Sequence, residues 1–196
     1  LDERAVPGDA AYASVLSGRV VPFVGRGREL ATLDALLAQT VAEASATAAR
    51  VTGPEGVGKS RLAREFVQRA RAQHGDALTV WTVRADPMGA GAAFGLLAAM
   101  LREAAGIRGV RDLADARQKL RTCFGPVLSA ALGTAEGEEA LGWVGELAGV
   151  PWDAAALPAL EAARGDAQWM GDALLTAWET LVGAVMAGGP LLLVLD

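Results

Sequence analysis

The stretch from Gly53 to Ser60 constrains the fold of this chain more than any other. It reads Gly-Pro-Glu-Gly-Val-Gly-Lys-Ser and matches the pattern G-x-x-x-x-G-K-[ST] at every specified position. Glycines let the backbone wrap closely around a phosphate, and the N–H groups at the start of a following helix attract the anion. A lysine can reach the outer phosphates, and a serine hydroxyl can bind Mg²⁺. The motif therefore predicts a phosphate-binding loop between a strand and a helix.

The lysine of this motif stands out against the rest of the composition. Lys59 and Lys119 are the only lysines in the chain, and arginine supplies the remaining positive charge. A compact ammonium on a flexible stem suits a phosphate here, and an arginine fork is not its equivalent. The alternative, a glycine-rich turn that merely precedes a helix, does not explain this choice of residue. The residues expected to contact a nucleotide are Gly53, Pro54, Glu55, Gly56, Val57, Gly58, Lys59, Ser60 and Arg61.

The flanking residues fit the strand–loop–helix context that the motif requires. Residues 46–52 are predicted to form a short strand that enters the loop. Residues 61–74 are predicted to form a helix, because apolar side chains recur there at helical spacing. These side chains are Leu62, Phe66, Val67 and Ala70. Gly75 then provides a helix stop.

Composition and charge restrict the class of protein. At 196 residues and 52% hydrophobic, the chain is long enough for one sizeable core and at most one domain with a subdomain. The net charge is −5, and of the 18 basic residues only Arg164 follows Arg121, so the C-terminal part is strongly acidic. This argues against nucleic-acid binding there. The lone Cys123 excludes an internal disulfide framework and suits a reducing cytoplasm.

The apolar runs and the first residues indicate whether the protein spans a membrane and whether it is part of a longer chain. The runs at 87–101 and 181–195 are interrupted by glycines and are shorter than the ~18 residues expected of a membrane span. No signal peptide is visible. Residues 1–22 have little periodicity and are predicted to be a linker or the tail of a preceding domain. Since the first residue is leucine, we expect a piece of a longer chain. The lone cysteine leads us to expect that this chain is cytoplasmic.

A second motif precedes the loop. Phe23 opens the stretch Phe-Val-Gly-Arg-x-x-Glu-Leu. A helix is predicted to follow, because an apolar stripe appears at helical spacing. The stripe consists of Leu30, Leu33, Leu37 and Val41. Taken alone, the motif could be a hydrophobic staple and turn before a helix.

Together with residues 52–64, this stretch resembles the N-terminal ATPase module of STAND-type signalling ATPases. These are AAA-related P-loop proteins, found in large LuxR-type transcriptional regulators and in some multidomain adenylate cyclases and kinases. The resemblance implies ATP and Mg²⁺ as ligands. It also implies that Val24, Gly25 and Arg26 lie by the adenine and ribose. Family members usually have an acidic residue where this chain has Gly27, so a polar contact is expected to be missing there.

Beyond the loop, one strand and then a series of helices are predicted. Residues 77–84 alternate and are rich in β-formers, which predicts a second strand. No convincing strand follows until 190, and residues 87–190 are predicted to be a helical insertion. Prolines and glycines separate its expected helices, at 92–105, 110–124, 138–148 and 166–186. We predict that the apolar stripe of the last helix lies in the core, including Trp169 and Trp178. The same is predicted for Trp143 and Trp152.

The chain closes on an apolar run that ends in an acidic residue. Residues 191–195 follow Gly-Gly-Pro and suit a strand buried on both faces of a parallel sheet. Asp196, at its C-terminal end, is the type of residue with which P-loop enzymes hold Mg²⁺. Paired with the loop, the run resembles the Walker B strand of the family. Ser60 and Asp196 are the expected metal ligands, and Lys59 and Asp196 the expected catalytic residues.

These features predict an α/β fold of the P-loop NTPase type, a three-layer αβα sandwich with a parallel sheet, over residues 23–196. The resemblance implies that a strand following residue 196 inserts between the last strand and the loop strand. We therefore expect an incomplete domain that self-associates and hydrolyses ATP only when completed. Its expected function is that of an ATP·Mg²⁺-binding switch module in a larger bacterial signalling or transcription-regulatory protein, with the effector domain elsewhere in the parent chain.

Three other functions stay open. A small-molecule P-loop kinase would need an arginine-bearing lid within residues 87–190, and the second half of that stretch has almost no arginine. A non-catalytic scaffold could use the loop only to order itself on nucleotide. A DNA-loading ATPase of the origin-recognition type would need a DNA-binding domain beyond residue 196. His74 and Cys123 have no sequence partners that would make a metal or nucleophile site, and both are interpreted as structural.

Overall fold

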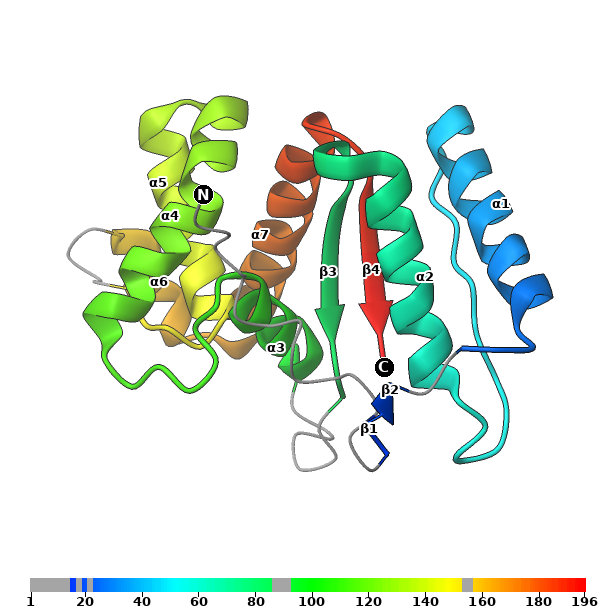
Figure 1. Ribbon diagram of the computed structural model, residues 1–196. Helices are drawn as coiled ribbons and strands as arrows, with labels where there is room; N and C mark the ends of the chain where they lie inside the picture. The colour runs from blue at the N-terminus through cyan, green and yellow to red at the C-terminus, as the bar shows by residue number, and fades with distance from the viewer. Residues whose placement is uncertain (1–14, 17–18, 21–22, 86–92, 153–156) are drawn as a thin grey trace, which may run out of the picture. The chain divides into compact units, whose positions relative to one another are not determined.

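The computed structural model of the chain describes residues 15–16, 19–20, 23–85, 93–152 and 157–196 (Figure 1). The chain divides into two compact units, Leu1–Arg50 and Val51–Asp196. The boundary between them lies inside the segment predicted as the first strand. The predicted linker at 1–22 lies mostly outside the described residues.

The first unit contains one short strand pair and one helix. Strand β1 (Val15–Leu16) pairs antiparallel with β2 (Arg19–Val20), so part of the predicted linker is paired. Helix α1 (Gly27–Glu43) confirms the helix predicted there and ends at Ala44 in a left-handed conformation, with φ of 48°. Of its apolar stripe only Leu30 is buried, and Val41 at the far end is 40% exposed.

The predicted strand at 46–52 is wrong. These residues have no regular secondary structure, and residues 46–52 are exposed. Among the described residues, the two sheets pair β1 with β2 and β3 with β4, and neither includes this segment. A strand without a neighbour leaves its N–H and C=O groups unpaired. Water satisfies those groups equally well in an irregular segment.

The helix after the loop and the two later strands confirm their predictions. Helix α2 (Lys59–His74) buries the four predicted side chains and is followed by the short 3₁₀ helix η2 (Gly75–Ala77). Strand β3 (Thr79–Val83) pairs in parallel with β4 (Leu191–Leu195). Because parallel strands need a long crossover, the helices between them form one connection.

Strand β4 is less buried than its apolar sequence predicts. Leu193 is 40% exposed and Leu195 is 61% exposed, and the other three residues of β4 are half-buried, so the predicted burial on both faces is wrong for the whole strand. Successive side chains of a strand point to opposite faces of the sheet, so Leu193 and Leu195 share one face. That face of β4 is incompletely covered, whereas its backbone is paired with β3.

The described residues of the crossover between β3 and β4 form helices joined by irregular connections, with no strand among them, as predicted. Its helices are α3 (Gly95–Ala104), α4 (Leu113–Leu132), α5 (Thr134–Leu147), α6 (Pro158–Arg164) and α7 (Ala167–Ala187). Helix α4 packs on α5 and α7, and α3 packs on β3. The short helix α6 was not predicted, and the predicted start of the first helix at residue 92 lies outside the described residues.

Helix α4 continues through Pro126, where the sequence predicted a break. An interior proline costs ~3 kcal/mol because it removes one helical hydrogen bond and crowds the preceding turn. Leu128, just beyond it, is fully buried, and Val127 and Leu132 pack against the same core. Burial of one such side chain stabilises by about 1.5–3 kcal/mol. Tertiary packing therefore outweighs the local cost.

Aromatic side chains join the sheet to the helices. The ring of Trp81 on β3 lies 5.8 Å from that of Phe124 on α4 and 6.0 Å from that of Trp178 on α7. Trp152 is also buried, at 5% exposure, whereas Trp169 is 44% exposed and is the member of the predicted core set that lies at the surface. Trp169 stands in the first turn of α7, where its own N–H is capped by Asp166.

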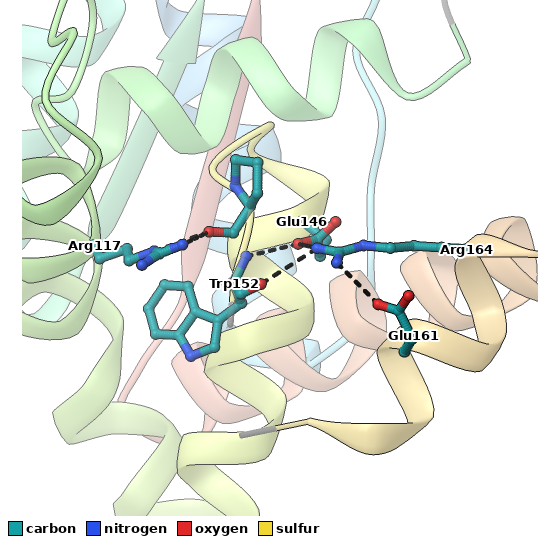
Figure 2. Close-up of polar contacts among 6 residues, drawn as sticks. Arg117, Glu146, Trp152, Glu161 and Arg164 are labelled. Atoms are coloured by element: carbon teal, nitrogen blue, oxygen red, sulfur yellow. Dashed lines mark hydrogen bonds and ion pairs between the residues drawn. The ribbon is translucent and has the colours of Figure 1, made fainter. Parts of the chain in front are cut away.

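Polar contacts hold Pro151 and Trp152, which follow α5, from both sides (Figure 2). Glu146 Oε1 accepts hydrogen bonds from the Trp152 backbone N–H at 2.7 Å and from Arg164 Nη2 at 2.8 Å. Arg117 Nε donates to the Pro151 carbonyl at 2.8 Å from the other side. Gly145 completes the fit, because a Cβ there would lie 2.7 Å from the Trp152 ring. These arginines thus hold the insertion together.

Candidate functional site

The glycine loop has the backbone shape that its sequence predicts. Gly56 and Gly58 have φ of 75° and 93°, a left-handed region that side chains with a Cβ rarely adopt. Gly58 forms the N-cap of α2, and within the described residues no side chain caps this helix. The first N–H groups of a helix have no partner within the helix, and the helix dipole favours an anion there. The loop can accept a phosphate.

Lys59 lies across the loop that precedes it. Its ammonium donates hydrogen bonds to the Gly53 carbonyl at 3.0 Å and to the Pro54 carbonyl at 2.9 Å. The side chain of Lys59, which stands at the end of the loop, is thereby tied to the start of the loop. An ammonium carries three donors, so one remains for a ligand in this arrangement. The contacts explain why the loop keeps its shape with its backbone exposed.

Ser60 and Asp196 are in contact at the N-terminus of α2. Ser60 Oγ donates a hydrogen bond to Asp196 Oδ1 at 2.7 Å. The carboxylate stands at the carboxyl end of β4, held by the sheet ladder, because the Asp196 N–H donates to the Val83 carbonyl at 2.9 Å. The structure therefore brings together the two side chains that the sequence predicted as metal ligands.

The oxygen donors at this point suit a magnesium ion. Mg²⁺ prefers oxygen ligands, keeps several of its waters, and uses one or two carboxylates together with substrate phosphates. A serine hydroxyl and a carboxylate lie here beside a helix N-terminus able to hold phosphate. The residues present fit the ion. No group of three or more metal-binding His, Cys, Asp or Glu side chains occurs among the described residues, so phosphate oxygens and water would complete its coordination.

Arg84 is a residue of this site that the sequence did not single out. It directly follows β3, and its Nε lies 3.8 Å from Asp196 Oδ2. The signal available in the sequence was its position, as the first charged residue after an apolar strand. Its partner became evident only from the parallel register, which sets Val83 opposite Leu195.

The residues expected beside the adenine lie in the other unit of the chain. Val24 is 76% exposed, and Gly25 has φ of 78° in the turn before α1. Arg26 is the N-cap of α1, and its Nη1 contacts Glu29 Oε1 at 2.6 Å. The hydrogen bond from Arg26 lowers the pKa of the Glu29 carboxyl. This turn is therefore organised by its own ion pair, and its role toward a nucleotide stays a prediction.

A cavity of about 510 Å³ lies in the helical region, between α4, α5 and the start of α6. Its lining includes Arg117 and Arg121, whose guanidinium groups lie 5.9 and 5.1 Å from the centre of the Trp152 ring. Arg121 also pairs with Glu138. No residue of the glycine loop and neither strand end lines this cavity. It is therefore separate from the site around Ser60.

The comparisons with known proteins fit this geometry. A family model described as an AAA ATPase domain matches residues 22–196. A search of curated proteins and a search of solved structures found no match. Together with the parallel strands, the loop and the helices, the family match confirms the predicted α/β fold of the P-loop NTPase type. In the described part of the chain, no helix combines the length and apolarity needed to cross a membrane.

Proposed function

Since the chain belongs to the AAA ATPase domain family and is a nucleotide-binding ATPase module, we propose that it binds ATP with Mg²⁺ and serves as the switch of a larger signalling or transcription-regulatory protein. The observation that carries the ligand assignment is the contact between Ser60 and Asp196. It joins a phosphate loop to the carboxylate of a strand end, which is where a P-loop protein needs its metal ligands.

The proposed roles follow from the geometry of each group. The backbone from Gly53 to Gly58 cradles the phosphates, and Lys59 neutralises their charge. Ser60 ligates the metal, and Asp196 holds the metal or its water. Mg²⁺ supplies charge neutralisation of the phosphates when it is bound. The remaining proposed contacts are Val24, Gly25 and Arg26 on the adenine side, with Arg61 in the first turn of α2.

The signalling role rests on the resemblance to STAND-type ATPases described above. The resemblance rests on the Phe-Val-Gly-Arg stretch and on the loop sequence through Arg64. The contacts of the insertion count against the kinase alternative. A kinase lid requires arginines that reach the phosphates, whereas Arg102 donates to the Ala148 carbonyl at 2.5 Å and Arg164 to Glu146 at 2.8 Å. These arginines are used to fasten helices.

The proposal is tested by calorimetric titration of the intact protein with ATP and ADP, with Mg²⁺ and with EDTA. We expect both nucleotides to bind, and ATP to bind more tightly when Mg²⁺ is present. Hydrogen exchange then measures whether the conformation differs between the ATP-bound and ADP-bound forms, as a switch requires. Equal exchange in the two forms would favour a scaffold that merely orders on nucleotide, and no binding of either nucleotide would refute the assignment.

A further inference from the structure

We propose that Arg84 is the counter-ion of Asp196 in the metal-free site and thereby sets the Mg²⁺ concentration that ATP binding requires. This inference rests on the proposed function, because it concerns the same metal site. It adds a positioning residue that neither the loop motif nor the family match assigns. The starting observation is that Asp196 has two different partners, one for each carboxylate oxygen.

The backbone fixes Arg84 beside Asp196. The two residues directly follow β3 and β4, whose last paired residues are Val83 and Leu195. The ladder continues past the strand ends, since the Asp196 N–H donates to Val83 O at 2.9 Å and the Ala85 N–H donates to Asp196 O at 2.7 Å. Paired residues of neighbouring strands project from the same face of a sheet. The meeting of these two side chains is therefore a consequence of the register.

The two oxygens of the Asp196 carboxylate have different partners, one neutral and one charged. Asp196 Oδ1 accepts the hydrogen bond of Ser60, and Oδ2 lies 3.8 Å from Arg84 Nε. Lys59 directs its ammonium to the carbonyls of Gly53 and Pro54. Within the described ranges, the ion pair with Arg84 is the one that Asp196 makes. Arg84 is thus the cation that balances this carboxylate before a metal does.

The exposure of the pair makes it exchangeable. The Arg84 side chain is 68% exposed and that of Asp196 is 35% exposed. Such pairs are weak and sensitive to salt. A metal at the carboxylate repels the guanidinium, which can turn to solvent or to a phosphate. The two cations compete for one group, so Arg84 raises the Mg²⁺ concentration needed for binding.

The test is a Mg²⁺ titration of the intact protein at a fixed concentration of a fluorescent ATP analogue, read by anisotropy. Arg84→Gln removes the charge and keeps a polar side chain of similar length. We expect its half-saturating Mg²⁺ concentration to fall by about twofold to fivefold, the size that the loss of an exposed ion pair gives. Arg84→Lys keeps the charge and is expected to stay close to wild type.

Arg108→Gln is the matched control. Arg108 is 74% exposed and pairs with Glu103 at 3.4 Å, so its removal costs a similar surface ion pair in the helical region. It is expected to leave the Mg²⁺ midpoint unchanged. A second readout is the affinity for the analogue in EDTA, which Arg84→Gln should leave within about twofold, since the pair involves the carboxylate and not the nucleotide.

Two outcomes overturn the inference alone, and they are distinguishable from failure of the proposed function. If wild type binds the analogue with Mg²⁺ but Arg84→Gln has an unchanged or higher Mg²⁺ midpoint, then Arg84 does not compete with the metal. If Arg84→Gln loses affinity equally with Mg²⁺ and with EDTA, then Arg84 contacts the phosphates instead. A wild-type protein that binds no nucleotide at any Mg²⁺ concentration would overturn the proposed function and this inference together.

Discussion

Ser60 Oγ donates a hydrogen bond of 2.7 Å to Asp196 Oδ1, across 136 positions of sequence. The contact requires two independent features of the fold. Helix α2 must begin at Lys59 to present the hydroxyl, and β4 must pair with β3 in register to present the carboxylate. One hydrogen bond therefore reports on both the loop and the sheet.

Removal of this hydroxyl is expected to weaken the metal-dependent part of nucleotide binding. Ser60→Ala leaves the carboxylate without its donor and the metal without a ligand. Hydrogen bonds to charged groups contribute about 1.5–3 kcal/mol, so we expect ATP·Mg²⁺ to bind at least about tenfold more weakly. Calorimetry with Mg²⁺ and with EDTA measures the effect. Ser60→Thr keeps the hydroxyl and should bind as wild type does, and an equal loss with and without metal would argue against a metal ligand.

The nucleotide base is expected to be adenine. Guanine-specific P-loop proteins read the ring with an Asn/Thr-Lys-x-Asp motif, which this chain lacks. Lys119, the one lysine outside the loop, lies in α4 and pairs with Asp115 at 3.1 Å. Competition of GTP against labelled ATP checks the preference. Displacement by GTP at concentrations equal to those of ATP would contradict it.

The loop, the helix after it and the strand end could be predicted from the sequence, because each depends on residues that are neighbours in the chain. Glycines at fixed offsets specify the turn, and an apolar run closed by Asp196 specifies a strand terminus. The failures depend on partners distant in sequence. Residues 46–52 have strand composition but no described neighbour to pair with, and Pro126 is tolerated because Leu128 is buried beyond it. Arg84 was missed because only the register of β3 on β4 brings it to Asp196.

The packing of α5 against Trp152 gives a stability prediction. Gly145→Ala would place a Cβ 2.7 Å from the Trp152 ring, and overpacking of this kind costs about 1–3 kcal/mol. Urea denaturation followed by far-ultraviolet circular dichroism measures the free energy of unfolding. Gly183→Ala is the control, since a Cβ there meets nothing within 4 Å and lies inside α7. It should stabilise by about 0.5–1 kcal/mol. Equal effects at both positions would contradict the packing described.

The single cysteine gives a prediction of pH dependence. Cys123 is an exposed residue, but partial desolvation of its thiol raises its pKa, and Sγ donates a hydrogen bond to the Ala104 carbonyl at 3.5 Å. A raised pKa means less thiolate at any given pH, so alkylation at pH about 8 should be slower in the folded protein than in urea. The rate in the folded protein should rise at higher pH than the rate in urea. Superimposable profiles would show that the fold does not perturb this thiol.

The most direct test of the proposed nucleotide site is the effect of replacing Lys59 on ATP·Mg²⁺ affinity. The Lys59 ammonium already bridges the two carbonyls at the start of the loop, and the proposed function adds the phosphates as its main partners. The matched control is Lys119→Ala, which removes the other lysine from an exposed ion pair on α4. Calorimetric titration of the intact wild type and both variants with ATP·Mg²⁺ decides the question. We expect Lys59→Ala to lose about 2–3 kcal/mol of binding free energy and Lys119→Ala to bind as wild type does. Equal affinities of wild type and Lys59→Ala would contradict the nucleotide site proposed here.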